Sequence, residues 1–292
     1  MATYVTSDAH GHLRALDRAL ELAAPGASDQ IYVLGDMIDR GPDPLGVIRL
    51  VRGLPNAHVM MGNHERLMLD ALLGDDPALA GGWEMNGGWS TSGQLDALAS
   101  EELSEVIDWA ATLPLFDIVR VEDRFAAGRH RGAAPERTYL LCHAGIDALA
   151  ARGFLATMGI DLDEPGVAAG IGIEPLVKMM MEQAPLDLLW IREQFWGAPT
   201  GLVDADGLGP IVVAGHTPTS LLGRFARLMG GPVLDGAERA RVVEVGACQD
   251  TGGIADRIDI DAGAAGGAPN GQVAVMRLED HAVWYAPVLE GE

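Results

Sequence analysis

The chain has 292 residues and a mass of 30.7 kDa, which is enough for one large domain or two small ones. Apolar residues make up 48% of it and charged residues 21%, a composition that excludes an intrinsically disordered chain. Twenty Lys and Arg residues stand against 42 Asp and Glu residues, so the net charge is −22. Such a charge excludes nucleic acid and anionic membranes as the main partners, because both would repel the chain.

The two cysteines, Cys142 and Cys248, are too few for a disulfide framework and favour a reducing compartment. The first residues show no basic segment followed by an apolar one, so we expect no signal peptide. No apolar run reaches the length of about 18 residues that a membrane span needs. We therefore expect a cytoplasmic protein without a membrane partner.

The N-terminal part of the chain alternates short apolar runs with helical patterns. The apolar runs cover residues 3–6, 31–34 and 58–61, and each ends in a polar cluster that precedes a helical pattern. This alternation is typical of parallel α/β units. The polar clusters should therefore lie at the carboxyl ends of the strands, where open α/β sheets place their sites.

The rest of the chain gives a mixed pattern. We expect a Gly-rich loop with two tryptophans at 82–93, an exposed loop at 123–136, and helices at 101–112 and 174–183. Strands are expected at 114–121, 138–142 and 211–214, and further strand-like runs at 241–245, 258–260, 272–278 and 282–285 indicate a second, mostly antiparallel sheet. No linker or repeat interrupts the chain, so residues 1–292 are expected to form one domain.

Six polar side chains at the predicted strand ends have the chemistry of metal ligands: Asp8, His10, Asp36, Asn63, His143 and His216. Carboxylate, imidazole and amide ligands without thiolate suit Mn, Fe, Zn or Co. Asp8 and His10 are two residues apart, which on a strand would turn both to the same side. A central carboxylate can bridge two ions, so we assign Asp8, His10 and Asp36 to one ion and Asp36, Asn63, His143 and His216 to the other.

The spacing of two motifs makes this assignment specific. The pattern Gly35-Asp36-x-x-Asp39-Arg40-Gly41 would arise by chance about once in 10⁵–10⁷ starting positions at ordinary residue frequencies. The next predicted strand ends in Gly62-Asn63-His64-Glu65. Together the two motifs exclude coincidence.

With His143-Ala-Gly and Gly-His216-Thr, these motifs resemble the calcineurin-like metallophosphoesterases. Within them the chain is similar to the phosphoprotein (serine/threonine) phosphatase branch in its compact bacterial form. Residues 187–192, Asp-Leu-Leu-Trp-Ile-Arg, match that branch, and so do residues 260–263, although the family usually has Thr where this chain has Ala262. The resemblance covers nearly the whole chain. It implies a four-layer α/β/β/α sandwich with mixed sheets and two divalent metal ions, with Mn²⁺ expected and Fe, Zn or Co as alternatives.

The resemblance also implies roles for residues beside the six ligands. His64 would be the general acid on the leaving oxygen, oriented by Asp39, and Arg40 and Arg192 would grip the phosphate oxygens. The physical chemistry agrees, since a metal-bridging water becomes a nucleophile near neutral pH and an alkoxide leaving group needs a proton. Two guanidinium groups bind a trigonal phosphoryl group as planar forks.

These features favour a dimetal phosphomonoesterase acting on phosphoserine and phosphothreonine in proteins, or on small phosphoesters. The alternative is a symmetrical diadenosine tetraphosphatase, a group in which the second motif usually lacks this Asp-Arg-Gly form. A third hypothesis is a non-catalytic phosphate-binding scaffold, which would need a broken site. The oligomeric state stays open.

Residues 147–187 are expected to include a cap insertion, because this stretch is longer here than in compact bacterial relatives of the resembled family. It leads directly into Arg192, so it would emerge near the mouth of the site. An extra surface helix packed on the core is the equal alternative. His12, one turn beyond His10, either touches substrate or serves the following helix as a cap.

Overall fold

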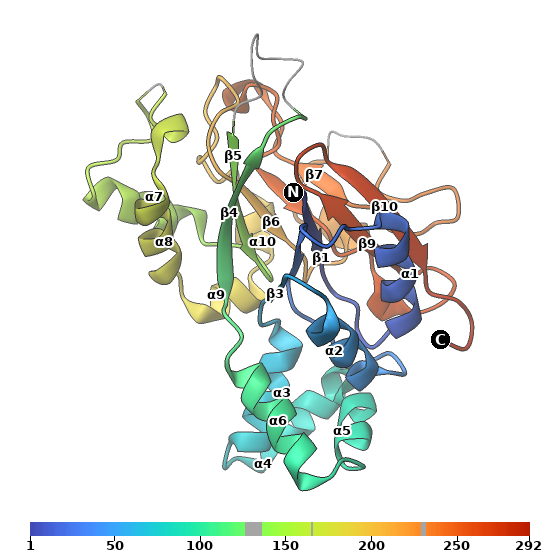
Figure 1. Ribbon diagram of the computed structural model, residues 1–292. Coiled ribbons are helices and arrows are strands. Elements are labelled where there is room, and N and C mark those ends of the chain that lie inside the picture. The colour runs from blue at the N-terminus through green and yellow to red at the C-terminus, as the bar shows by residue number, and fades with distance from the viewer. Residues whose placement is uncertain (126–135, 165, 229–231) are drawn as a thin grey trace.

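The computed structural model describes residues 1–125, 136–164, 166–228 and 232–292, so the loop expected at 123–136 lies mostly outside the described residues. Two five-stranded sheets form the centre of the molecule (Figure 1). The first has the strand order β10-β9-β1-β2-β3, with β1 at Thr3–Thr6, β2 at Gln30–Val33, β3 at Ala57–Val59, β9 at Gln272–Arg277 and β10 at Ala282–Pro287. The second has the order β4-β5-β6-β8-β7, with β4 at Phe116–Glu122, β5 at Glu136–Cys142, β6 at Ile211–Ala214, β7 at Val243–Val245 and β8 at Arg257–Asp259.

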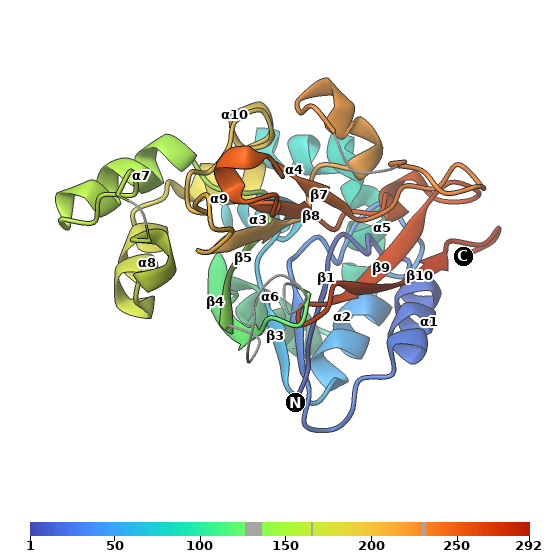
Figure 2. The same cartoon turned by 90° about the horizontal axis from the view of Figure 1, so that it is seen from above.

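The predicted alternation of strands and helices in the N-terminal part is confirmed. Strands β1, β2 and β3 are parallel neighbours, and each is followed by a helix. The helices of this half are α1 (Leu13–Ala23), α2 (Pro44–Gly53), α3 (Asn63–Leu73), α4 (Pro77–Trp83), α5 (Trp89–Leu95) and α6 (Ser100–Ala111). Helices α1 and α2 lie on the side of the first sheet that faces away from β7 and β8 (Figure 2).

The separate C-terminal sheet that the sequence predicted is wrong. Strands β7 and β8 join the second sheet, where β8 runs parallel to β6, whereas β9 and β10 extend the first sheet through antiparallel pairing of β9 with β1. Strand periodicity sets which residues share a face, but it does not choose the neighbouring strand. Both sheets are therefore mixed, as the predicted fold class requires.

Alternation along single strands builds the four layers. On β1, Tyr4 packs with α1 and α2, whereas Val5 packs against residues of the other sheet. On β5, Tyr139 lies between the sheets, while Cys142 lies on the outer face. That outer face is covered by α7 (Ala148–Thr157), α8 (Ile173–Met181), α9 (Pro185–Trp190) and α10 (Glu193–Trp196). The order is helices, sheet, sheet, helices, which is the predicted α/β/β/α sandwich.

The segment 82–93 is helical and not the loop that its glycines indicated. Helix α4 runs into a π-helical turn at Glu84–Gly88 and then into α5. Gly87 has a φ of 103°, which only glycine adopts readily, and it bends the chain between the two helices. The bend buries Trp83, which is 2% exposed, while Trp89 is 65% exposed.

The expected cap region 147–187 carries α7, α8 and α9. On α7 and α8, Leu155, Leu176, Met179 and Met180 are fully buried against the outer face of the second sheet. Figure 2 shows both helices at the side of the molecule near β4 and β5. Across the described parts of the chain, we find no helix with the length and apolar character that crossing a bilayer would require.

Candidate metal centre

The loops after five parallel strands bring the predicted ligands to one place. Strands β1, β2 and β3 are parallel neighbours in one sheet, and β5 and β6 are parallel neighbours in the other. Their carboxyl ends therefore meet at the same edge of the sandwich. The residues that follow these ends are Asp8 and His10 after β1, Asp36 after β2, Asn63 and His64 after β3, His143 after β5, and His216 after β6.

The backbone at this edge is strained. Asp8, His10, Asp36 and His216 have φ values of 53°, 43°, 51° and 64°, in the left-handed region that side chains rarely adopt. The reason given above for pairing Asp8 with His10 is therefore wrong, because β1 ends at Thr6 and strand alternation does not reach them. The left-handed turns bring the two side chains together instead. Strain of this kind persists only where the surroundings hold it, and it gathers at functional sites.

Asp36 lies at the centre of the cluster. Its Oδ2 is 3.5 Å from Nε2 of His10, and its Oδ1 is 3.4 Å from Nε2 of His143. Two groups of donors, His10 with His64 and His143 with His216, each gather with Asp36 closely enough to hold one ion. Oδ1 of Asn63 is 2.9 Å from Nε2 of His143 and 2.8 Å from Nδ1 of His216. The two sides of Asp36 thus match the predicted bridging position.

Backbone carbonyls orient two of the imidazoles. Nδ1 of His10 lies 2.9 Å from the carbonyl of Ile38, and Nδ1 of His143 lies 2.8 Å from the carbonyl of Leu34. If Nδ1 carries the proton and donates it to the carbonyl, Nε2 keeps its lone pair and faces Asp36. This arrangement is usual for histidines that bind metals.

Charge and burial also fit a cation. Burial, together with neighbouring positive groups, holds the pKa of His10 and of His216 well below the ordinary histidine value, so both rings are neutral. Burial raises the pKa of Asp36 well above its usual range. Oδ2 of Asp8 accepts from the backbone N–H of His216, while the buried Oδ1 has no partner among the described residues. A bound cation would satisfy this oxygen and offset the burial of both carboxylates.

The expected acid forms a closed buried network. Nδ1 of His64 is 2.6 Å from Oδ2 of Asp39, which also accepts from the indole N–H of Trp83 at 2.8 Å. The hydroxyl of Thr91 donates to Oδ1 of Asp39 at 2.5 Å and accepts from its backbone N–H at 2.9 Å. Burial acts to lower the pKa of His64, but the carboxylates of Asp36 and Asp39 outweigh it and raise that pKa.

The two arginines reach the cluster from opposite sides. The guanidinium of Arg40 lies 3.3 Å from Nε2 of His10 and 2.9 Å from Nε2 of His64. Arg192 precedes α10, is half-buried, and donates to the carbonyl of His216 at 3.3 Å. Burial lowers the pKa of Arg192, and Asp261 acts against that shift. Asp261 lies in the late motif 260–263, so the structure brings this motif to the site as well.

Three residues at this site were missing from the predicted set. Trp83 and Thr91 hold Asp39, and their only signal in the sequence was a Gly-rich segment with two tryptophans. Glu65 is buried, and its carboxylate accepts from the backbone N–H groups of Asp36, Met37 and Gly62, each at 2.8 Å. Glu65 therefore fixes the strained loop that carries the central aspartate.

Replacing Glu65 by Gln should lower the free energy of unfolding by about 2–3 kcal/mol, because hydrogen bonds to a charged group are lost and an N–H then faces an N–H. Urea denaturation measures this change. Glu21→Gln, at an exposed position of α1, is the matched control and should shift stability by at most about 0.5 kcal/mol. Equal stabilities of the two variants would contradict the role of Glu65.

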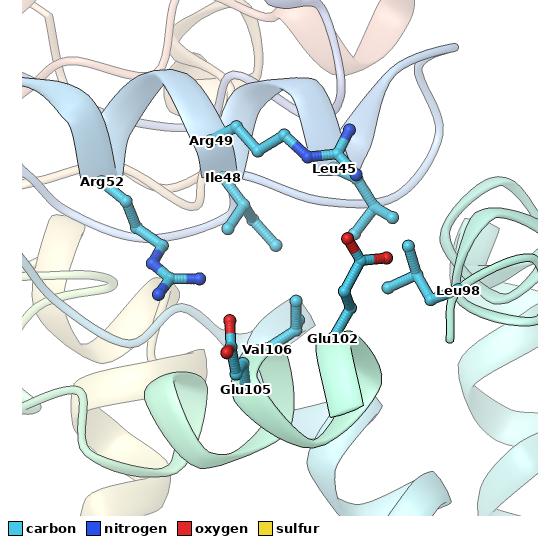
Figure 3. A pocket seen from close by; sticks show the side chains of 8 residues that line it. All are labelled: Leu45, Ile48, Arg49, Arg52, Leu98, Glu102, Glu105 and Val106. Carbon is cyan, nitrogen blue, oxygen red and sulfur yellow. The ribbon is translucent and has the colours of Figure 1, made fainter. Parts of the chain in front are cut away.

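A pocket between α2 and α6 lies apart from this centre. Its volume is about 210 Å³, and its lining contains none of the predicted site residues. Figure 3 shows Arg49 and Arg52 on α2 facing Glu102 and Glu105 on α6 across it. It lacks the histidines and aspartates that the metal centre contains.

Comparison with known families identifies the class of protein. The chain belongs to the calcineurin-like phosphoesterases, whose family model matches residues 1–249. Members of this family use a dinuclear metal site, so the protein is a metal-dependent phosphoesterase, a hydrolase. This excludes the non-catalytic scaffold considered above.

The curated relatives point to one activity. The symmetrical bis(5′-nucleosyl)-tetraphosphatase of Erwinia tasmaniensis is 31% identical over 139 residues, 47% of this chain and 46% of that enzyme. The enzyme of the same name from Methylococcus capsulatus is 33% identical over 148 residues, 50% of this chain and 44% of that enzyme. The chain therefore matches about half the length of these relatives.

Solved structures share the fold. A protein serine/threonine phosphatase from Saccharomyces cerevisiae aligns with a TM-score of 0.52 and 14% identity over 100% of this chain and 81% of that chain. A structure provisionally described as a diadenosine tetraphosphatase aligns with a TM-score of 0.54 and 16% identity, over 99% of this chain and 94% of that chain. At these identities the likeness shows the fold alone.

Proposed function

We propose that this phosphoesterase hydrolyses dinucleoside tetraphosphates symmetrically, at two metal ions held on either side of Asp36. The observation that supports it most is the double donor set around one buried carboxylate, which suits a pair of ions. The substrate is supported by the tetraphosphatase names of the curated relatives. This reverses the order of the two hypotheses that the motifs favoured.

The residues around the centre would divide the chemistry as follows. Asp8, His10 and Asp36 would hold one ion, and Asp36, Asn63, His143 and His216 the other; we propose Mn²⁺ for both. When bound, two such ions activate water and neutralise charge on the phosphoryl group. Arg40 and Arg192 would bind the phosphoryl oxygens, and His64 would give a proton to the leaving oxygen while Asp39 keeps its ring in place.

Serine/threonine phosphatase activity is the second candidate, and the pair of His64 with Asp39 specifically favours it. A serine or threonine alkoxide is a poor leaving group and needs a proton, whereas a nucleoside diphosphate leaves readily. A buried acid whose pKa is raised by carboxylates suits the harder leaving group. Phosphorylated proteins and small phosphoesters therefore remain proposed substrates.

A substrate panel with purified, Mn²⁺-loaded protein distinguishes the two candidates. It compares diadenosine tetraphosphate, phosphoserine and phosphothreonine peptides, cyclic nucleotides and an aryl phosphate. We expect diadenosine tetraphosphate to give the highest kcat/KM and to yield ADP as the sole nucleotide product. A higher kcat/KM on phosphopeptides, or AMP and ATP as products, would overturn the proposal.

Arg40→Ala and Arg192→Ala should each weaken transition-state binding by about 2–4 kcal/mol, the scale of one lost charge-stabilising donor. The measurement is kcat/KM on the best substrate of the panel. Arg66→Ala, which removes an exposed arginine paired with Asp70 on α3, is the control and should leave kcat/KM unchanged. A wild-type kcat/KM in either site variant removes that arginine from the site.

We also propose that residues 1–292 form one domain and that residues 147–187 are a cap insertion on it. The buried faces of α7 and α8 support a cap that is packed on the second sheet. A cytoplasmic location is proposed as well, and it is supported by two cysteines that are both unpaired, Cys142 buried and Cys248 exposed.

A further inference from the structure

A groove opens beside the metal centre on the side of Arg40. Its volume is about 450 Å³, within the range of roughly 300–1,000 Å³ that small-molecule sites have. Arg40 lines this groove and also contacts His10 and His64, so the groove and the metal centre share one guanidinium. A molecule in the groove could therefore extend a phosphate towards the metal centre.

One wall of the groove is an aromatic face. Trp89 begins α5, is 65% exposed and lines the groove, whereas Trp83 at the end of α4 is buried on Asp39. A large exposed indole beside an arginine is unfavourable in water, since its apolar surface stays hydrated. The same indole offers a stacking surface to a flat ring, and such stacking does not depend on which base is bound.

Two buried polar atoms also belong to residues that line the groove. Ser90 and His12 are 9% and 5% exposed, and within the described ranges neither the hydroxyl of Ser90 nor Nδ1 of His12 has a hydrogen-bond partner. Buried polar groups are nearly always paired in folded proteins. His12 also precedes α1 without capping it through its side chain. A ligand edge with donors and acceptors would satisfy both atoms.

We propose that this groove binds the nucleobase of a nucleoside polyphosphate, stacked on Trp89 and hydrogen-bonded to Ser90 and His12. The phosphate chain then runs past Arg40 to the metal centre. At the far side Glu292 is paired with Arg18, so its carboxylate is partly neutralised by that arginine. The inference rests on the proposed function, because it names the subsite that would make nucleotides preferred substrates.

Calorimetry on the Mn²⁺-loaded protein tests this subsite. The probes are α,β-methylene ADP, which carries the base and resists cleavage between its phosphorus atoms, and methylenediphosphonate, which lacks the nucleoside. We expect the wild-type protein to bind the nucleotide more tightly. Trp89→Ala should weaken nucleotide binding by about 5-fold to 100-fold and leave methylenediphosphonate binding unchanged.

Two further variants make the test specific. Trp89→Phe keeps a ring and should retain most of the nucleotide affinity, while Ser90→Ala should weaken it by about 3-fold to 10-fold. Met85→Ala is the control, since Met85 is 85% exposed on the same segment and does not line the groove. It should bind both probes as the wild-type protein does.

Equal wild-type affinity for both probes would overturn the inference, and so would a Trp89→Ala variant that binds the nucleotide normally or loses both probes equally. These failures differ from failure of the proposed function. If diadenosine tetraphosphate is cleaved while Trp89→Ala binds normally, only the subsite is wrong. If the subsite test succeeds while phosphopeptides are the best substrates, only the proposed activity is wrong.

Discussion

Replacing Asp36 by Asn should reduce kcat about a thousandfold and remove at least one bound metal ion. The neutral amide cannot hold two cations together, and metal ions contribute several kcal/mol to stabilising the transition state. Both donor groups of the centre use this one carboxylate, so the effect should exceed that of any other single ligand change. Steady-state kinetics and metal analysis of the purified variant measure the two losses.

Asp17→Asn is the matched control, because it makes the same chemical change at an exposed position of α1. It should keep wild-type turnover and metal content. An Asp36→Asn variant with two retained ions and normal kcat would remove Asp36 from the bridging position.

His64→Asn should retain metal but slow the hydrolysis of alkyl phosphates by about 10²–10⁴-fold, the usual contribution of a general acid. Aryl phosphates and dinucleoside tetraphosphates carry better leaving groups and should slow much less. Asp39→Asn should give a milder version of the same pattern, because the bond between Asp39 and Nδ1 of His64 orients the ring. The measurement is kcat on a phosphoserine peptide and on an aryl phosphate for each variant.

His58→Asn provides the control, since His58 stacks on Tyr32 at an exposed position on β3. Both substrates should be hydrolysed at the wild-type rate. An equal loss on both substrates in His64→Asn would show that His64 positions the phosphate and does not supply the proton.

The sequence predicted most of the fold because its periodicities are strong and local. The apolar runs that became β1, β2 and β3, and the helices after them, are visible as patterns of two and of 3.6 residues. The pairing of β9 with β1 is not visible in this way, because it joins residues more than 260 positions apart, such as Thr6 and Val275. Nothing in either strand selects its neighbour, so the tail was assigned to a sheet of its own.

The site was predictable where short motifs follow strands, as for Asp36 and Asn63. It was not predictable where a distant side chain supports the motif. Trp83 and Thr91 contact Asp39 from 44 and 52 positions away, and a bend at Gly87 separates these two residues. The left-handed backbone at Asp8 and His10 was also hidden, since only tertiary contacts stabilise such a conformation in residues with side chains.

Anomalous X-ray scattering at the manganese edge, from crystals grown with Mn²⁺, tests the central claim most directly. The account predicts two peaks about 3.5–4 Å apart, one on each side of the Asp36 carboxylate. One peak would lie near His10 and the other near His143 and His216. Absence of manganese at Asp36, or a single peak there at full occupancy, would contradict the dimetal centre.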